Sequence, residues 1–267
     1  MNNTRRAFLG ASAAAAAHVW VPKPVKGYTA AESVPVIPQK AGISKWDLDT
    51  PALCVDLAKM ERNIAKMQRT CNANKIAVRP HAKTHKCAAI AKMQMAAGAI
   101  GICTAKLSEA EALFAEGIDR ILMTTANLPP AKIRRAMELK KRCPGFIQAV
   151  DYDVNVRELN DAAKAAGVVA DVVIDVAVGT RTGIPPGEDA IKLAQLVDKS
   201  PSLKLRGLLS YDGGAQHISG FAARKERALK SIEENARTQE KMKASGLNTE
   251  IFSGGGTGTY HIFPLVA

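Results

Sequence analysis

Short apolar runs that alternate with helical patterns constrain the fold of this chain of 267 residues more than any other feature. Each run is mostly apolar or β-branched and is bounded by turn residues, as buried strands are. The expected strands are residues 76–79, 99–105, 120–125, 146–151, 171–178, 205–211 and 250–253. Because the segments between them have helical patterns, the alternation predicts an α/β fold made of parallel βαβ units.

The segments between the expected strands contain helix boundaries. Residues 108–111 have the spacing of a capping box, which predicts that a helix begins there. Residues 129–130 are both proline, which is favoured in the first turn of a helix. Gly167 and Gly246 follow helical patterns and predict the ends of two further helices.

The expected strands are one fewer than a closed (β/α)8 barrel of the TIM type requires. Seven runs are visible, and the sequence ends soon after the seventh. We therefore expect residues 41–267 to form an incomplete barrel that lacks its eighth strand.

The positive net charge raises the question of nucleic-acid binding. The formal net charge is +12 at pH 7. The first 40 residues contain five basic residues and one acid, so they account for +4, and the other +8 is spread over many helices. Aromatic residues make up only 4% of the chain, so platforms for base stacking are scarce. We therefore expect a generally basic surface and no nucleic-acid partner.

The N-terminal segment resembles a twin-arginine export signal. Residues 4–9 have the sequence Thr-Arg-Arg-Ala-Phe-Leu and are followed by an alanine-rich stretch. That stretch is too short and too weakly apolar to span a membrane, so no stable membrane anchoring is expected. An Arg-Arg pair without a targeting role is the alternative. The resemblance predicts a signal and linker in residues 1–40 and a periplasmic location.

A lysine between two histidines follows the first expected strand. The sequence Arg-Pro-His-Ala-Lys-Thr-His-Lys begins at Arg79 and places Lys83 between His81 and His85. Polar residues at the carboxyl end of a buried strand occupy the position where α/β barrels hold their catalytic groups. Arg79, the two histidines and Lys86 are cationic neighbours, which together with burial favour the neutral, nucleophilic amine of Lys83. A solvated basic loop is the alternative.

A glycine-rich loop follows the last expected strand. Residues 253–260 have the sequence Ser-Gly-Gly-Gly-Thr-Gly-Thr-Tyr, with four glycines in five positions. Such a backbone can approach an anion closely and direct N–H groups and hydroxyls at phosphate oxygens. Barrels often bind phosphate in the loops after their last two strands. A flexible loop without a ligand is the alternative.

Two further expected strands deliver polar side chains to the same end of the sheet. Arg181 follows one of them, and a fixed cation there can orient a cofactor or a substrate carboxylate. Pairing of Arg181 with Asp175 at the rim is the alternative. Tyr211 and His217 lie at the end of the next strand and in the loop after it. His217 is a candidate acid or base, and a solvated loop histidine is its alternative.

These motifs together resemble those of the D-threonine aldolase and D-serine dehydratase family of pyridoxal 5′-phosphate (PLP) enzymes. The resemblance covers about residues 47–262. It implies a PLP-binding (β/α)8 barrel of the alanine racemase type, here without the C-terminal β-domain of the family. The run that contains Arg181 is similar to a segment of such barrels in which the arginine faces the active site.

The resemblance also implies a role for each candidate residue. Lys83 would carry PLP covalently and act in catalysis, with His217 as an acid or base near the substrate. Arg181 and Tyr211 would contact the cofactor. The expected phosphate contacts are Gly255, Gly256 and Thr257.

The implied activity is that of a lyase acting on D-3-hydroxy amino acids. Retro-aldol cleavage would give glycine and an aldehyde, as in D-threonine aldolase. A D-serine dehydratase-like lyase and a non-catalytic PLP-binding barrel are the alternatives. The family adds a divalent metal through its C-terminal domain, so no metal ligand is assigned in this sequence. A small D-amino acid is the expected partner, and a homodimer is left open.

Overall fold

The computed structural model describes residues 44–179 and 182–262. The chain divides into two compact units, Met1–Cys54 and Val55–Ala267. In the first unit, the short 3-10 helix η1 (Lys45–Asp47) begins after Ser44, whose hydroxyl oxygen accepts a hydrogen bond of 3.3 Å from the Trp46 N–H. The second unit contains the sheet and all the candidate residues.

A single parallel sheet forms the centre of the second unit. Its strands lie in the order β1-β2-β3-β4-β5-β6, so each pairs with its neighbour in sequence. The strands are β1 (Ile102–Thr104), β2 (Ile121–Met123), β3 (Phe146–Val150), β4 (Ala170–Asp175), β5 (Leu203–Ser210) and β6 (Ile251–Gly254). The predicted parallel α/β fold is confirmed. Within the described residues the sheet stays open between β1 and β6.

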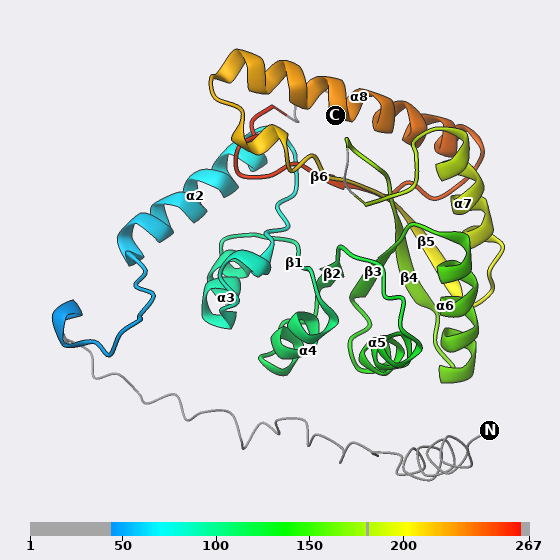
Figure 1. Ribbon diagram of the computed structural model, residues 1–267, viewed down its shortest axis with the longest axis horizontal. Coiled ribbons are helices and arrows are strands. Elements are labelled where there is room, and N and C mark those ends of the chain that lie inside the picture. Colours follow the sequence, from blue (N-terminus) through cyan, green and yellow to red (C-terminus); the bar gives the residue numbers. More distant parts are fainter. Residues whose placement is uncertain (1–43, 180–181, 263–267) are drawn as a thin grey trace, which may run out of the picture. The chain divides into compact units, whose positions relative to one another are not determined.

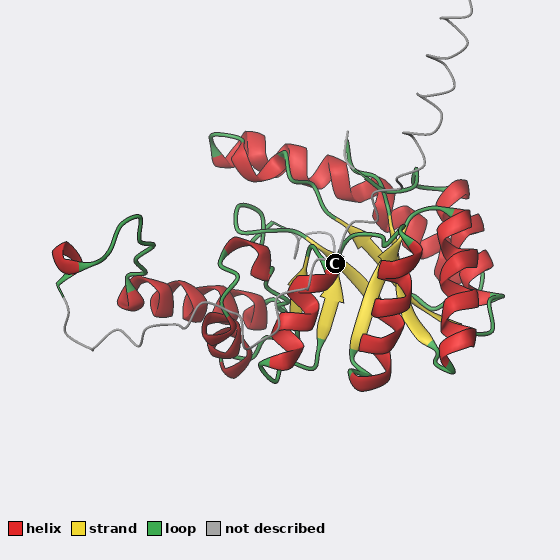
Figure 2. Ribbon diagram, turned by 60° about the horizontal axis from the view of Figure 1, so that its bottom comes forward, coloured by secondary structure: helices red, strands yellow, loops and turns green. Residues whose placement is uncertain are grey.

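Helices connect the strands and cover the outside of the sheet. They are α2 (Leu57–Ala73), α3 (Ala88–Ala96), α4 (Leu107–Ala115), α5 (Pro130–Arg142), α6 (Asp153–Ala166), α7 (Glu188–Asp198) and α8 (Phe221–Ala244). From α3 to α8 they follow one another around the sheet (Figure 1), and the strands run side by side within them (Figure 2). No helix in the described part of the chain is long and apolar enough to cross a membrane.

The strands are apolar on both faces because both faces are buried. Outward side chains pack against the helices in one large core cluster. Inward side chains form a second, smaller cluster, which consists of Cys103, Leu122, Ile147, Ala149, Val173 and Leu209. This pattern explains why the strands appear in the sequence as continuous apolar runs rather than as alternating ones.

The first expected strand is not a strand of this sheet. Residues 76–79 run beside β1, since the Ile100 N–H donates to the Val78 carbonyl (2.9 Å) and the Cys103 N–H donates to the Pro80 carbonyl (2.7 Å). Only an isolated bridge between His81 and Cys103 is formed. Pro80 has no N–H with which to return a ladder hydrogen bond. The predicted seven strands are therefore six in the described residues, although the segment still delivers the lysine motif to the edge of β1.

Most predicted helix boundaries are confirmed, with one exception. Gly167 ends α6 with a φ of 68°, and α5 begins at Pro130. The capping box at residues 108–111 is wrong, because α4 begins at Leu107 and its N-cap is Lys106. The earlier start buries Leu107 in the core, and the Glu109 carboxylate accepts the Ala105 N–H at 2.9 Å.

A glycine allows β5 and β6 to lie unusually close together. Gly207 has a φ of 130°, and a Cβ placed there would lie 2.0 Å from the Ile251 carbonyl oxygen. Only glycine combines this conformation with this contact. The pairing brings together the loops that follow the two strands.

A partly buried ion network joins the amino-terminal ends of the strands. Lys140 of α5 donates to Asp171 at 2.5 Å, and Arg206 of β5 donates to the other oxygen of Asp171 at 2.8 Å. Arg206 also pairs with Glu250 at 2.8 Å. Burial alone would raise the pKa of Asp171, but the hydrogen bonds from Lys140 and Arg206 outweigh it and lower that pKa. The network lies at the opposite end of the sheet from the candidate residues.

Candidate functional site

The candidate lysine lies on a short turn beside β1, directly after the segment that runs along this strand. Lys83 is in the 3-10 helix η2 (Ala82–Thr84), and its N–H donates to His81 Nδ1 at 3.3 Å. Its side chain is exposed, and its Nζ lies 5.5 Å from the centre of the Tyr211 ring. The structure thus brings together two predicted site residues that are far apart in the sequence.

Hydrogen bonds fix the ring of His81 and with it the start of η2. His81 Nε2 lies 3.2 Å from Thr124 Oγ1, and the Thr124 hydroxyl donates to the Thr104 carbonyl at 3.2 Å. Thr124 Oγ1 therefore accepts from Nε2, while Nδ1 accepts from the Lys83 N–H. His81 therefore positions the lysine turn through both of its ring nitrogens.

The cationic surroundings of Lys83 differ from those expected. Burial raises the pKa of Cys103 to about 12, against the opposing positive charges of Arg79 and Lys83, so both cations lie near this thiol. Burial also lowers the pKa of His85 and favours its neutral form. Lys86 pairs with Glu109 at 4.0 Å. Arg79 lies in the same neighbourhood as Lys83, and burial lowers the pKa of Arg79 itself.

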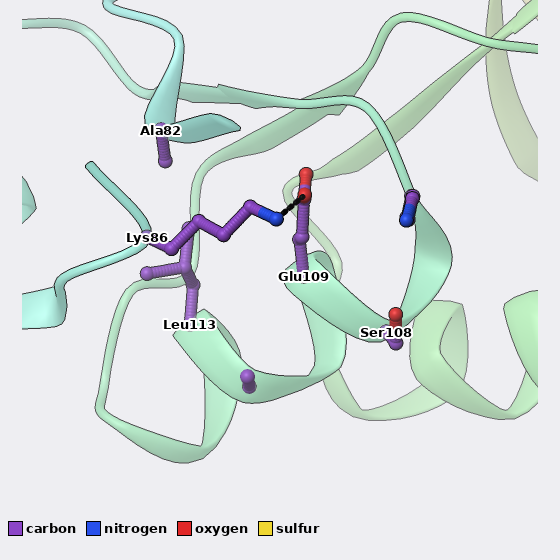
Figure 3. Close-up of a pocket in the computed structure, with 7 residues that line it drawn as sticks. Ala82, Lys86, Ser108, Glu109 and Leu113 are labelled. Carbon is purple, nitrogen blue, oxygen red and sulfur yellow. Dashed lines mark ion pairs between the residues drawn. The ribbon is translucent and has the colours of Figure 1, made fainter. Parts of the chain in front are cut away.

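A cavity of about 320 Å³ lies on the α4 side of the lysine turn (Figure 3). The Lys86 side chain extends across it to Glu109. Its lining residues are Ala82, Lys86, Lys106, Ser108, Glu109, Ala112 and Leu113. Ala82 borders the cavity, but the described lining does not include Lys83. The cavity is thus adjacent to the candidate site without being part of it.

The glycine loop begins beside Tyr211. Ser210 and Gly254 are partners in the β5–β6 ladder, so Tyr211 and Gly255 leave the sheet at the same edge. Gly255 has a φ of 73°, a left-handed conformation that favours glycine. The loop then turns back on itself, since the N–H groups of Thr259 and Tyr260 both donate to the Gly256 carbonyl at 2.9 Å.

Gln216 is a contact of this loop to which the sequence analysis assigned no role. It lies in the 3-10 helix η3 (Ala215–His217), which follows β5. Its side-chain amide accepts from the Gly258 N–H and donates to Thr259 Oγ1. The glycines of the loop were the one indication of this contact in the sequence, because a glycine can be required by a neighbouring side chain as well as by a ligand.

Of the two remaining predicted residues, the structure describes His217. His217 is exposed at the end of η3. This turn is fixed by the buried Asp212, which accepts from the Ala215 N–H at 3.1 Å and from Arg227 of α8 at 2.9 Å. Arg181 lies outside the described residues, so its role and its pairing with Asp175 remain predictions. In the described ranges, no group of three or more His, Cys, Asp or Glu residues could hold a metal ion.

The fold and these motifs agree with a match to a known protein family. The family model described as "Alanine racemase, N-terminal domain" matches residues 55–266. The chain belongs to this family. The match covers the complete sheet, the lysine turn and the glycine loop, and so confirms the expected alanine racemase-like fold.

Named relatives within this family resemble the chain more specifically. A 3-hydroxy-D-aspartate aldolase of Paracoccus denitrificans is 33% identical over 88% of this chain and 60% of its own length. The crystal structure of a D-threonine aldolase from Filomicrobium marinum has a TM-score of 0.80 and 37% identity over 82% of this chain and 60% of that one. A D-threo-3-hydroxyaspartate dehydratase from Delftia has a TM-score of 0.72 and 32% identity over 80% of this chain and 57% of that one. The chain thus spans about 60% of the length of the aldolases it matches.

Proposed function

We propose that this chain is the PLP-binding part of a lyase that acts on D-3-hydroxy amino acids, with cleavage of the D-threonine aldolase type. The observation that supports this most strongly is the position of Lys83 Nζ, 5.5 Å from the Tyr211 ring. The glycine loop begins at the same sheet edge as Tyr211. A lysine amine, an aromatic ring and a glycine-rich loop thus lie at the carboxyl end of a parallel sheet, where α/β barrels hold cofactors.

The residues present fit PLP chemically. Among the described residues, no hydrogen bond engages the N–H of Gly255 or of Thr257, and Thr257 is exposed. These N–H groups can donate hydrogen bonds to a phosphate, while the exposed amine of Lys83 can bond to the aldehyde carbon. Tyr211, which lies near Lys83, is suited to pack against an aromatic ring.

PLP supplies an electron sink for the electrons released when a substrate bond breaks. The chain supplies the other functions. Lys83 would hold the cofactor through its side-chain amine. His217 would accept the proton of the substrate β-hydroxyl at an imidazole nitrogen as the Cα–Cβ bond breaks, and would donate it to the α-carbon of the glycine product, a role that its exposed position permits. Arg181 is proposed to orient the cofactor or a substrate carboxylate.

Product analysis tests this proposal. The purified chain is incubated with PLP, with and without a divalent cation, and with D-threonine or D-threo-3-hydroxyaspartate. We expect glycine and an aldehyde to form, L-threonine to be inert, and His217→Asn to bind PLP but to form product at least about a hundredfold more slowly. PLP binding without any product would contradict turnover by this chain alone and support the non-catalytic alternative.

The alternative with a specific basis is dehydration. The Delftia relative is named as a dehydratase and resembles this chain nearly as closely as the aldolases do. Loss of water from the same substrates, followed by hydrolysis of the resulting imine with release of ammonia, would give a 2-oxo acid instead of glycine. The two products separate the aldolase from the dehydratase in one assay.

We also propose that the chain is exported through the twin-arginine route. The support is the sequence of residues 4–9 and the alanine-rich stretch after it, both outside the described residues. Fractionation of cells that express the chain with Arg5 and Arg6 intact, or replaced by lysine, tests this. The intact chain is expected in the periplasm and the Arg5→Lys, Arg6→Lys variant in the cytoplasm. Equal distribution of the two would contradict the proposal.

A further inference from the structure

We propose that Gln216 is a positioning residue that holds the glycine loop in its anion-binding conformation. In this conformation the N–H groups of Gly255 and Thr257, rather than that of Gly256, donate to the cofactor phosphate. The inference rests on the proposed function, because it names the groups that would bind the phosphate of PLP.

The side-chain amide of Gln216 is fully used by the structure. Its Oε1 accepts from the Gly258 N–H at 2.8 Å. Its Nε2 donates to the Asp212 carbonyl at 3.1 Å and to Thr259 Oγ1 at 3.0 Å. Three hydrogen bonds therefore fix the orientation of one amide between two loops.

Thr259 connects Gln216 to the centre of the loop, and we call the hydrogen bonds of Gln216 and Thr259 the clamp. Its side chain is fully buried, and its Oγ1 accepts the Gly256 N–H at 3.1 Å. The Gly256 carbonyl accepts two backbone N–H groups, as described above. Both backbone groups of Gly256 and the N–H of Gly258 are thus occupied within the protein. Of the four residues from Gly255 to Gly258, only Gly255 and Thr257 keep an unengaged N–H in the part of the chain that the structure describes.

Gly256 and Gly258 lie too close to Gln216 to carry a side chain. A Cβ on Gly256 would lie 2.6 Å from Gln216 Oε1, and a Cβ on Gly258 would lie 2.7 Å from the Gln216 carbonyl oxygen. Neither separation is compatible with a side chain at the glycine position. Gly256 and Gly258 therefore allow the two loops to approach each other, whereas the left-handed Gly255 turns the backbone at the sheet edge.

The clamp is anchored on rigid elements at its other end. Asp212 holds η3 through the Ala215 N–H and is itself held by Arg227 of α8. These hydrogen bonds, with those of Gln216, thus connect α8, η3 and the glycine loop into one unit. Such preorganisation places donors before the ligand arrives and reduces the entropy lost on binding.

The test compares binding of PLP with binding of pyridoxal, which has the same aldehyde but no phosphate. In Gln216→Glu, the ionised carboxylate cannot donate to the Asp212 carbonyl and adds a negative charge beside the anion site. We expect PLP affinity to fall about ten- to a hundredfold at pH 8, and pyridoxal affinity to stay within about threefold of wild type. At pH 5, where the introduced carboxyl is partly protonated and again resembles an amide, the difference from wild type should shrink.

Two further variants keep the test decisive. Gln239 also donates to a backbone carbonyl, that of Thr249 at 3.0 Å, but it lies on α8 away from the loop. Gln239→Glu should therefore leave the ratio of PLP to pyridoxal affinity unchanged. If Gln216→Glu does not fold, Thr259→Val removes the hydroxyl that links Gly256 to Gln216 and should give the same selective loss of PLP affinity.

The outcomes separate this inference from the proposed function. If the wild-type chain shows no preference for PLP over pyridoxal, the proposed function fails and the inference fails with it. If wild type has the preference and Gln216→Glu keeps it in full, only the role of Gln216 is overturned. An equal loss of both ligands by Gln216→Glu would also overturn it, because that result indicates general structural damage.

Discussion

Lys83 Nζ lies 5.5 Å from the centre of the Tyr211 ring, although Lys83 precedes β1 in the chain and Tyr211 follows β5. Tyr211 follows Ser210, the ladder partner of Gly254. One aromatic residue therefore lies between the candidate nucleophile and the start of the candidate phosphate loop. Because an ammonium group near a ring face is stabilised by the ring, this contact also orients the lysine before a cofactor binds.

Replacing the Tyr211 ring is expected to weaken cofactor binding. Tyr211→Leu removes both the surface for the cofactor ring and the contact with Lys83, so PLP affinity should fall about tenfold or more. Tyr211→Phe keeps the ring and should lose less. Titration of each variant with PLP, followed by absorbance, measures both. A larger loss in Tyr211→Phe than in Tyr211→Leu would show that the hydroxyl, not the ring, is important.

Breaking the ion network around Asp171 is expected to destabilise the fold without changing the site. Asp171→Ala leaves the buried Lys140 ammonium without its counter-charge, and such losses cost about 3–5 kcal/mol of unfolding free energy. Urea denaturation measures the change. The exposed pair Lys141–Glu138 provides a matched control, since Glu138→Ala should cost less than about 1 kcal/mol. Equal effects of the two substitutions would contradict the assigned burial.

Stability should fall as the pH is lowered through the histidine range. Burial lowers the pKa of His85 in the folded chain, so the unfolded chain binds the proton more readily. The stability provided by the neutral ring is complete above the unfolded pKa of about 6.5 and is lost as the pH falls below it. His261, whose pKa is lowered by burial and by Arg224 and Lys66, has the same sign.

Removing His85 should flatten part of this dependence. His85→Asn keeps an acceptor for the Cys87 N–H but cannot be protonated in this range. Thermal unfolding between pH 5 and pH 7.5 should show a smaller loss than in wild type, and the double variant with His261→Asn a smaller loss still. An unchanged slope in the double variant would show that other groups control stability in this range.

The buried thiol beside Lys83 should be unreactive. Burial raises the pKa of Cys103 to about 12, whereas Cys54 is exposed. Brief treatment of the native chain with a thiol reagent at pH 8, followed by peptide mass spectrometry, should label Cys54 and leave Cys103 unlabelled until the chain is unfolded. Labelling of Cys103 at the rate of Cys54 would contradict its placement in the interior.

Much of this architecture could be predicted from the sequence because strands that are buried on both faces are visible as short apolar runs, and helix ends are visible as glycines. Apolar runs such as residues 146–151 and 171–178 predicted β3 and β4, and glycines such as Gly167 marked helix ends correctly. Pro80 was the visible reason why residues 76–79 would not form a ladder. A proline lacks a backbone N–H and so disfavours strand pairing, but the β-branched residues before Pro80 favoured a strand and determined the prediction.

The site was less predictable because it depends on distances between loops. The lysine motif and the glycine loop were visible as local patterns. The clamp by Gln216 was not visible, because it requires the close approach of β5 and β6 at Gly207 and the buried hydroxyl of Thr259. The cationic surroundings were also only partly predictable, since the sequence does not reveal that His85 is half-buried or that Lys86 extends to Glu109.

The central claim is that Lys83 is the residue that holds PLP. Its most direct test is to load the purified chain with PLP, reduce the carbon–nitrogen double bond with borohydride, digest the protein and identify the modified lysine by mass spectrometry. We predict that the label is on Lys83 and that Lys83→Ala abolishes it. Exclusive labelling of Lys86, which pairs with Glu109, or of Lys106 would contradict the account.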